Sequence, residues 1–223
     1  MKTVLIFSGG LDSTSLLFQL LKEKDQVVCL NFDYGSRHNQ MEQLSMRKIA
    51  TIAKVEYHII NLTEPFSLFK SSLLANSKVS IPHGHYAEEN MKKTVVPFRN
   101  AIMLSIAGGY AASIGFNRVA AGIHAGDHTI YPDCRIEFFS AFKDLLRVGL
   151  WEHVDFYAPF IWKSKGQVSI IGFDAGAPIF DTYSCYEGKE IHCGKCGACN
   201  ERKEAFKELE RERGIKDATD YTN

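Results

Sequence analysis

The chain has 223 residues, and its 26 basic and 26 acidic side chains balance to a formal net charge of zero. This length suits one α/β domain with at most a small appendage, and the balanced charge provides no field to gather nucleic acid, which favours a small-molecule substrate without direct nucleic-acid binding. Glycine, serine and tyrosine interrupt the longest apolar tract, residues 101–116, and the first residues lack a signal-peptide pattern, so we expect a cytoplasmic protein without a membrane span.

The first predicted strand leads directly into a loop of glycines and hydroxyls. Residues 3–7 predict a short buried strand, and leucines at 16, 17, 20 and 21 mark one face of the following helix. Unpaired amides and the positive end of the helix dipole favour a polyanion at this loop, and Asp12 is suited to hold Mg²⁺ against phosphate oxygens. The alternative is a glycine turn whose polar residues only cap the helix. The candidate nucleotide-binding residues are Phe7, Ser8, Gly9, Gly10, Leu11, Asp12, Ser13 and Thr14.

Two more strands follow, at residues 26–32 and 56–61, with a helix at about 39–54 between them. This alternation predicts a parallel sheet with right-handed crossovers. Because ligands lie beyond the carboxyl ends of such strands, the segment after the second strand is expected to border the nucleotide pocket. Asn31 and Asp33 are candidates for ribose or metal and Arg37 for phosphate, with ordinary turn chemistry as the alternative for each.

Residues 62–96 break the alternation, with two prolines and many polar residues, and predict a lid over the site or an oligomer-forming excursion. A helix over residues 101–114 follows. Arg99, just before it, is a candidate phosphate clamp because its guanidinium is planar and always charged. Asn100 is a candidate nucleotide contact that also suits the helix N-cap.

The last two predicted strands, residues 119–122 and 154–160, each end in a segment with candidate site residues. Gly122 begins a glycine-rich turn, which lets the backbone approach a ligand. Lys163 follows the fifth strand, where it can stabilise negative charge in a transition state, with an ordinary solvated lysine as the alternative.

Between these strands lies the pentad Tyr131-Pro132-Asp133-Cys134-Arg135, which opens a helix. Arg135 can grip a carboxylate with two hydrogen bonds, and Asp133 can accept from the N–H groups of a purine-like edge. A helix cap with a surface arginine is an equal alternative for this pentad.

Four of the six cysteines form a cluster near the end of the chain. Thiolates at this spacing can close a tetrahedron around zinc, and because such a site has no open position it is structural. An iron–sulfur cluster is the rival, but the following x-x-x-Cys-Pro of the ferredoxin run is absent. A charged helix over residues 200–213 follows. The candidate zinc ligands are Cys185, Cys193, Cys196 and Cys199.

The loop Ser-Gly-Gly-x-Asp-Ser-Thr resembles the PP-loop of the N-type ATP pyrophosphatases, which split ATP between its α and β phosphates. With residues 96–100, the pentad and the four-cysteine ending, nearly the whole chain resembles the 7-cyano-7-deazaguanine synthases of queuosine biosynthesis. The resemblance implies a Rossmann-like doubly wound five-stranded parallel sheet over residues 1–180, a zinc segment over 181–223, and a homodimer with one zinc per chain. It also implies ATP- and Mg²⁺-dependent conversion of 7-carboxy-7-deazaguanine and ammonia to 7-cyano-7-deazaguanine through an acyl adenylate and an amide.

Three positions depart from that family pattern: Phe98 where glycine is usual, Ile130 where glycine is common, and Tyr183 where tryptophan is frequent. They flank the expected site and bear on the exact substrate. A PP-loop tRNA thiolase with Cys134 or Cys29 as sulfur carrier, or a relative with another acceptor, is the alternative. The expected catalytic residues are Asp12, Arg99, Lys163, Asp133 and Arg135, and the expected substrate contacts are Phe98, Tyr131, Asp133 and Arg135.

Overall fold

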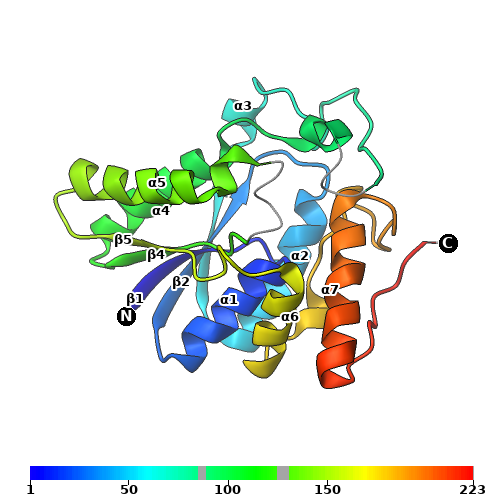
Figure 1. The fold of residues 1–223 in the computed structure, drawn as a ribbon. Coiled ribbons are helices and arrows are strands. Elements are labelled where there is room, and N and C mark those ends of the chain that lie inside the picture. The colour runs from blue at the N-terminus through cyan, green and yellow to red at the C-terminus, as the bar shows by residue number, and fades with distance from the viewer. Residues whose placement is uncertain (85–88, 125–130, 223) are drawn as a thin grey trace.

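The computed structural model describes residues 1–84, 89–124 and 131–222, and a five-stranded parallel sheet forms its centre (Figure 1). The strands lie in the order β3-β2-β1-β4-β5. Val4 of the central strand β1 lies between Val28 of β2 and Val119 of β4, and all three are apolar because helices cover both faces of the sheet. The strand bounds are β1 Lys2–Ile6, β2 Gln26–Asp33, β3 Glu56–Asn61, β4 Arg118–Ala120 and β5 Asp155–Tyr157.

One face of the sheet is covered by α1, α2 and α6. Leu16 of α1, Ile49 of α2 and Val168 of α6 are fully buried in one apolar core with Leu5 and Cys29 of the sheet. The spacing of the leucines in the first helix therefore predicted its buried face correctly. The bounds of these helices are α1 Leu11–Lys22, α2 Asn39–Ala53 and α6 Lys165–Asp174.

The opposite face is covered by α4 and α5, which lie together in Figure 1. Leu104 of α4 and Phe142 of α5 belong to a second core that includes Val4 and Val119 of the sheet. The pentad before α5 forms a short 3-10 helix, η3. The bounds are α4 Arg99–Ser113, η3 Pro132–Cys134 and α5 Ile136–Gly149.

The excursion of residues 62–96 contains two short helices, α3 (Thr63–Phe66) and η1 (Glu89–Thr94). Arg37 holds its described part close to the sheet by donating to the main-chain oxygens of Ser72, Ser77 and Val79. Farther along, the amide of Gly84 donates to the oxygen of Lys195, 3.2 Å away. The excursion therefore connects the edge of the sheet with the cysteine-rich segment, and its action as a lid or an oligomer contact stays a prediction.

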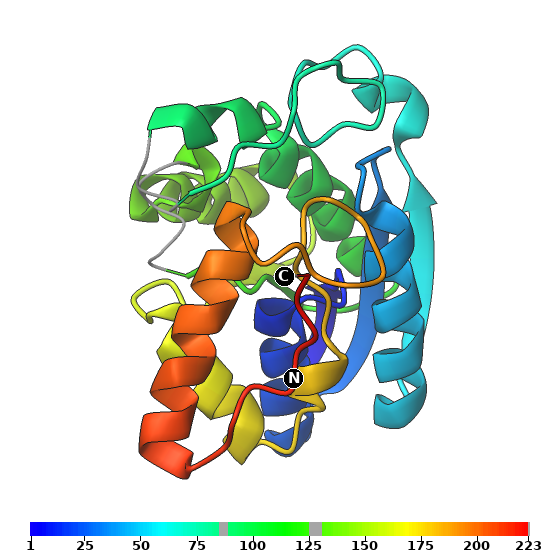
Figure 2. The same cartoon turned by 90° about the vertical axis from the view of Figure 1, so that its right-hand side faces the viewer.

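The C-terminal part of the chain packs on the first face of the sheet through α6 (Figure 2). It contains the 3-10 helix η4 (Ile179–Asp181) and α7 (Gly197–Arg213). Phe206 and Leu209 of α7 share a small core with Leu11 of α1. The last described residues run back along the cysteine-rich segment, where the amide of Thr222 donates to the oxygen of His192.

The predicted fold class is confirmed, because five parallel strands carry helices on both faces. The boundaries differ at several places. β4 covers residues 118–120 and β5 only residues 155–157, and α7 starts at Gly197 rather than at residue 200. α4 already starts at Arg99, so Phe98 rather than Asn100 is its N-cap. The division of the chain at residue 180 stays a prediction. None of the helices described in the structure has the length and apolarity needed to cross a membrane.

Candidate active site and metal centre

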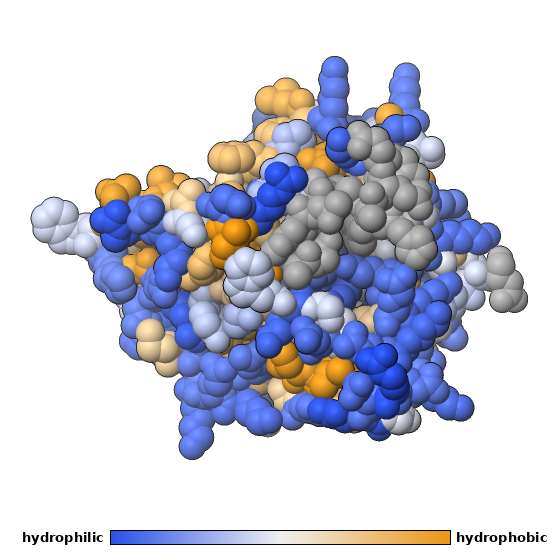
Figure 3. All heavy atoms as spheres, viewed as in Figure 1, coloured by the Kyte–Doolittle hydropathy of each residue, from blue (hydrophilic) through white to orange (hydrophobic). Residues whose placement is uncertain are grey.

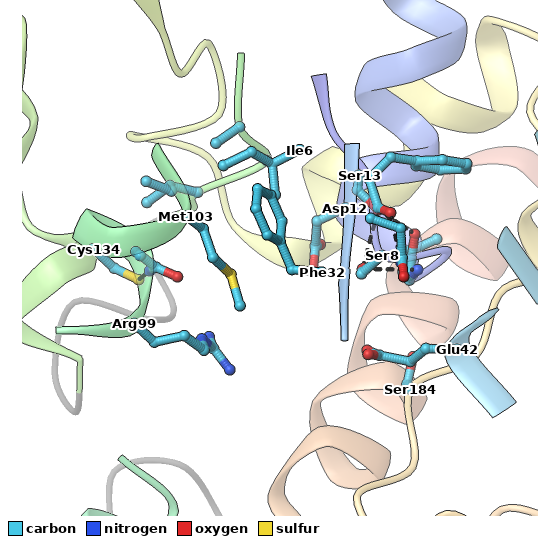
Figure 4. Close-up of a pocket in the computed structure, with 18 of the residues that line it drawn as sticks. Ile6, Ser8, Asp12, Ser13, Phe32, Glu42, Arg99, Met103, Cys134 and Ser184 are labelled. Carbon is cyan, nitrogen blue, oxygen red and sulfur yellow. Dashed lines mark hydrogen bonds between the residues drawn. The ribbon is translucent and has the colours of Figure 1, made fainter. Parts of the chain in front are cut away.

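A cavity of about 230 Å³ opens at the carboxyl ends of β1, β2 and β4 (Figure 4). The chain leaves β1 toward β2 on one side and returns to β4 on the other, so this cavity lies at the point where the strand order reverses. Ligands of doubly wound sheets bind at that point. Residues from the loop after β1, from α2, from α4 and from the cysteine-rich segment complete the lining.

The loop after β1 has a backbone shape that requires glycine. Gly9 has a φ of +86°, and a Cβ there would lie 2.6 Å from the amide nitrogen of Met46 in α2. The oxygen of Gly9 accepts from the Ser45 hydroxyl at 2.8 Å and from the Tyr183 amide at 3.1 Å. The loop is thus held between α2 and the cysteine-rich segment, which fixes its orientation toward the cavity.

Helix α1 begins without a side-chain cap. Ser13 donates to the oxygen of Gly10 and lies 3.3 Å from the Ser8 hydroxyl, which itself accepts from the Gly10 amide. The simple capping alternative is therefore wrong, and the amides at the start of the helix stay available to an anion. Of the predicted loop residues, Phe7, Ser8, Gly10, Leu11, Asp12 and Ser13 line the cavity, whereas Gly9 and Thr14 do not.

Asp12 lies in a cluster of charged side chains that the sequence did not indicate. The Lys165 ammonium is 3.1 Å from Asp12 Oδ2 and 2.8 Å from Glu201 Oε2, and His124 Nε2 is 3.7 Å from Asp12. Burial alone would raise the pKa of Asp12, but Lys165 and then His124 outweigh it and lower that pKa below 3.8. Asp12 is therefore a carboxylate at neutral pH.

Lys165, rather than Lys163, is the lysine of the cavity. Lys163 lies exposed in the turn before α6, outside the lining. Ser164 caps α6 reciprocally with Gln167, so Lys165 is the first helical residue. This Ser-x-x-Gln box was a usable signal for Lys165, because it locates the helix start at the edge of the sheet.

Arg99 forms the wall opposite the loop. It is held by Tyr34, whose hydroxyl accepts from the guanidinium at 3.2 Å and whose ring lies 5.5 Å from it. His38 Nε2 is 3.3 Å from the same hydroxyl and 3.8 Å from Glu42 Oε2. Tyr34, His38 and Glu42 all line the cavity, and no pattern in the sequence singles out His38 or Glu42 as site residues.

Asn31 and Asn100, two predicted nucleotide contacts, both line the cavity. Asn31 Nδ2 donates to the oxygen of Phe7, while its Oδ1 is buried and, among the described residues, has no hydrogen-bond partner. An orphaned acceptor in a cavity wall is suited to a ligand N–H group. Asn100 Nδ2 donates to the oxygen of Asp133 and to Cys134 Sγ.

The pentad contributes Tyr131 and Cys134 to the cavity, whereas Asp133 and Arg135 lie outside its lining. The Asp133 carboxylate accepts from the amide of Asn100 at 2.9 Å, so it caps the start of α4. The Arg135 side chain is exposed at the start of α5. Asp133 is therefore placed to act through Asn100.

The remaining predicted residues also fall into two groups, those that line the cavity and those that lie outside its lining. Gly122 lines the cavity, and a Cβ there would lie 2.9 Å from the Asp12 carbonyl carbon. Asp33 accepts from the Gly35 amide in a turn, and Arg37 binds the excursion; neither lines the cavity. Phe98 is 68% exposed with a φ of +60°. Ile130 lies outside the described residues.

The four clustered cysteines form a metal-binding geometry. Their sulfur atoms all lie within 4.8 Å of one another, and those of Cys193 and Cys199 are 3.9 Å apart. A zinc tetrahedron with bonds of about 2.3 Å has edges of ~3.8 Å, so the spacing fits. The amides of Cys193 and Cys196 donate to Cys185 and Cys193 sulfurs, which suits thiolates. The donor set and its geometry therefore fit zinc.

Comparison with known proteins shows the family of the chain. The family model described as "Queuosine biosynthesis protein QueC" matches residues 2–210. A 7-cyano-7-deazaguanine synthase from Pseudoalteromonas atlantica is 46% identical over 205 residues, which cover 92% of this chain and 93% of that protein. One from Methanoregula boonei is 42% identical over 221 residues, covering 99% of each. A solved structure of NMN synthetase from Francisella tularensis aligns with a TM-score of 0.47 at 14% identity, over 85% of this chain and 68% of that one. The chain belongs to the QueC family, together with these 7-cyano-7-deazaguanine synthases.

Proposed function

We propose that the chain joins 7-carboxy-7-deazaguanine and ammonia at the expense of ATP, and releases 7-cyano-7-deazaguanine, AMP and pyrophosphate. The observation that carries this proposal is the family match over residues 2–210, which includes every residue of the cavity described above. The uncapped glycine loop supports it, because a loop of this kind binds the leaving pyrophosphate. The reaction is a step of queuosine biosynthesis.

The substrate carboxylate attacks the α-phosphorus of ATP, and pyrophosphate departs toward the loop at residues 8–14. The loop amides and Lys165 stabilise the negative charge that develops on the leaving group. Arg99, on the opposite wall, stabilises charge on the carboxylate or the α-phosphate. The resulting acyl adenylate reacts with ammonia to give the amide. A second ATP adenylates the amide oxygen, and AMP leaves as the nitrile forms.

Asp12 is the residue that would hold Mg²⁺. Its Oδ1 is buried and has no hydrogen-bond partner among the described residues, and its lowered pKa keeps it ionised, so the donor fits a hard cation. When bound, the ion supplies positive charge to the phosphate oxygens. Lys165, itself paired with Glu201, holds the Asp12 side chain in place through its other oxygen, Oδ2.

For the deazapurine we propose Asn31, Asn100 and Tyr131 as contacts, since they bring hydrogen-bonding groups to the cavity wall. Asp133 positions Asn100 through the cap on α4. The predicted substrate roles of Phe98 and Arg135 require these exposed side chains to turn toward the cavity. The four cysteines hold one structural zinc ion per chain.

The family resemblance also leads us to expect a homodimer. The outer side of α5 carries exposed apolar side chains, with Leu145 51%, Val148 68% and Trp151 just after the helix 99% exposed. Figure 3 shows hydrophobic atoms gathered over this end of the molecule, among hydrophilic ones. No residue from 100 to 117, which include most of the neighbouring α4, is charged. We expect the second copy to bind there.

The test is to identify the products of one mixture of the purified protein, 7-carboxy-7-deazaguanine, ammonium, Mg²⁺ and ATP. Mass spectrometry should show the nitrile and two AMP for each nitrile. ADP with orthophosphate, or no consumption of ATP, would contradict the proposal. Omitting ammonium should still allow carboxylate-dependent exchange of labelled pyrophosphate into ATP.

A further inference from the structure

Glu42 is an acidic side chain in the cavity wall that neither the phosphate loop nor the zinc site uses. It lies in the first turn of α2, and its carboxylate is 19% exposed, toward the cavity. In Figure 4 the Glu42 carboxylate and the Arg99 guanidinium point toward each other from opposite walls, with Ser8 on the same side as Glu42. A ligand between the two walls therefore meets Glu42 on one side and Arg99 on the other.

The groups around Glu42 leave it able to exchange a proton. Within the described part of the chain, its one ion-pair partner is His38 of the same helix, 3.8 Å away, whose pKa burial lowers to about 3, so that this imidazole is neutral. Burial raises the pKa of Glu42 to about 8, against the opposing effect of Arg99 from α4. The other titratable groups of the adjoining cavity wall are Tyr34 after β2 and Tyr183 and Tyr186 in the cysteine-rich segment. Burial raises the pKa of Tyr34 and of Tyr183, so these two phenols stay neutral.

The chemistry needs such a group. Nitrogen enters as ammonia and ends as a nitrile, so it loses all of its protons within the cavity. Asp12 is a poor acceptor for them, because Lys165 binds it and lowers its pKa. We propose that Glu42 is the general base that takes protons from the reacting nitrogen in both halves of the reaction. This inference depends on the proposed function.

In the first half, ammonia adds to the acyl carbon and a C–N bond forms. The ammonium of the tetrahedral intermediate gives one proton to Glu42, and the C–O bond to AMP breaks with its electron pair on AMP. In the second half, the O-adenylated amide carries an NH₂⁺ group. Its two protons leave one after the other through Glu42 to solvent, the C–O bond to AMP breaks, and the C≡N bond is completed.

The test uses the amide, 7-carbamoyl-7-deazaguanine, as starting substrate, so that titration of ammonium does not enter. The kcat of wild type for nitrile formation should rise with pH through about pH 8, because Glu42 must be ionised. Glu42→Gln should lower kcat about 100-fold and abolish this rise. Glu42→Asp, which keeps a carboxylate, should retain part of the activity and the pH dependence.

Carboxylate-dependent pyrophosphate exchange separates this proposal from the proposed function. Exchange in Glu42→Gln should stay within about threefold of wild type, since adenylation needs no proton acceptor at nitrogen. Glu64→Gln, an exposed change in α3, is the matched control. Three results with Glu42→Gln would each overturn the role of Glu42. These are an unchanged kcat, a rise of KM alone, or a loss of exchange as large as the loss of kcat. Absence of exchange in wild type would instead overturn the proposed function.

Discussion

Lys163 and Lys165 lie two residues apart, and only the second reaches the cavity. We predict that Lys165→Ala lowers kcat for nitrile formation by at least about 100-fold, because the charge opposite the leaving pyrophosphate is lost. Lys163→Ala should stay within about threefold of wild type, since its exposed ammonium is screened by solvent. Steady-state kinetics of both variants measures this. A larger loss of kcat in Lys163→Ala than in Lys165→Ala would show that Lys163 turns inward when ATP binds.

Phe98 adopts a left-handed backbone conformation, with φ +60° and ψ +19°, at the N-cap of α4. This conformation costs L-residues about 1–2 kcal/mol and glycine almost nothing, which gives a physical reason for the glycine expected there from the family pattern. Glycine and alanine variants both lose the exposed ring, so their difference isolates the backbone. We predict that Phe98→Gly is more stable than Phe98→Ala by about 1 kcal/mol in urea unfolding.

Ser105 provides the control for that comparison, because it is exposed in the middle of α4. There the order should be reversed, with Ser105→Ala more stable than Ser105→Gly by about 1 kcal/mol. If alanine were also the more stable residue at position 98, the left-handed conformation would not be the cause of strain.

The residues that could be predicted from the sequence are those whose role depends on local chain geometry. Asp12 and the loop serines follow a strand and start a helix, so their position at the sheet edge was predictable. Glu42 lines the cavity only because α2 packs beside the loop. His124 and Glu201 lie far from Asp12 in the chain, and the fold brings both into its charged cluster. Asp33 and Arg37 also lie at the end of a strand, but their side chains make other contacts. Asp33 accepts from the Gly35 amide in a turn, and Arg37 donates to a main-chain oxygen of the excursion.

At the scale of elements, α7 links the four-cysteine cluster with the proposed phosphate loop. It begins directly after Cys196 and contains Cys199 of the cluster, and two residues later its Glu201 forms an ion pair with Lys165. Tyr183, two residues before Cys185, binds the oxygen of Gly9. Changes at the cysteines should therefore be transmitted to the loop at residues 8–14, for which we propose ATP binding.

We predict that Cys196→Ser releases zinc and lowers the free energy of unfolding by more than about 4 kcal/mol. At temperatures where the variant stays folded, the KM for ATP should rise, because Glu201 and Tyr183 lose their fixed positions. Zinc content, thermal unfolding and kinetics measure the three effects.

Cys134→Ser is the control for this prediction. This variant should keep its zinc and its ATP consumption, since Cys134 accepts a hydrogen bond from Asn100 in the cavity wall. Complete loss of turnover in this variant would favour sulfur transfer.

The strands could be predicted because they are short continuous apolar runs, and the amphipathic helices because one apolar face repeats along each of them. The last helix shows the limit of this method. Its sequence is highly charged, yet Arg202 is fully buried and donates to Thr182, Ser184, Thr219 and the oxygen of Ile179. These partners lie on either side of α7 in the chain, and the pattern of the helix alone contains no information about them.

At the scale of the whole molecule, the two helical layers differ in what they leave exposed. Helix α7 and the cysteine-rich segment cover the α1–α6 side, whereas nothing among the described residues covers the outer side of α5. The excursion was the other surface that the sequence suggested for oligomerisation. Its described part makes contacts within the chain instead, since Arg37 and the oxygen of Lys195 bind its backbone, although Leu68 stays exposed.

We therefore predict that Val148→Glu converts a dimer into a monomer, as measured by light scattering at micromolar concentration. A buried carboxylate without a partner would destabilise an interface by several kcal/mol, and each 1.4 kcal/mol weakens association about tenfold. Leu68→Glu, at an 85% exposed apolar side chain of the excursion, is the matched control and should leave the dimer intact. If only Leu68→Glu gave a monomer, the excursion would be the interface. If wild type itself were monomeric, the exposed face of α5 would serve another purpose.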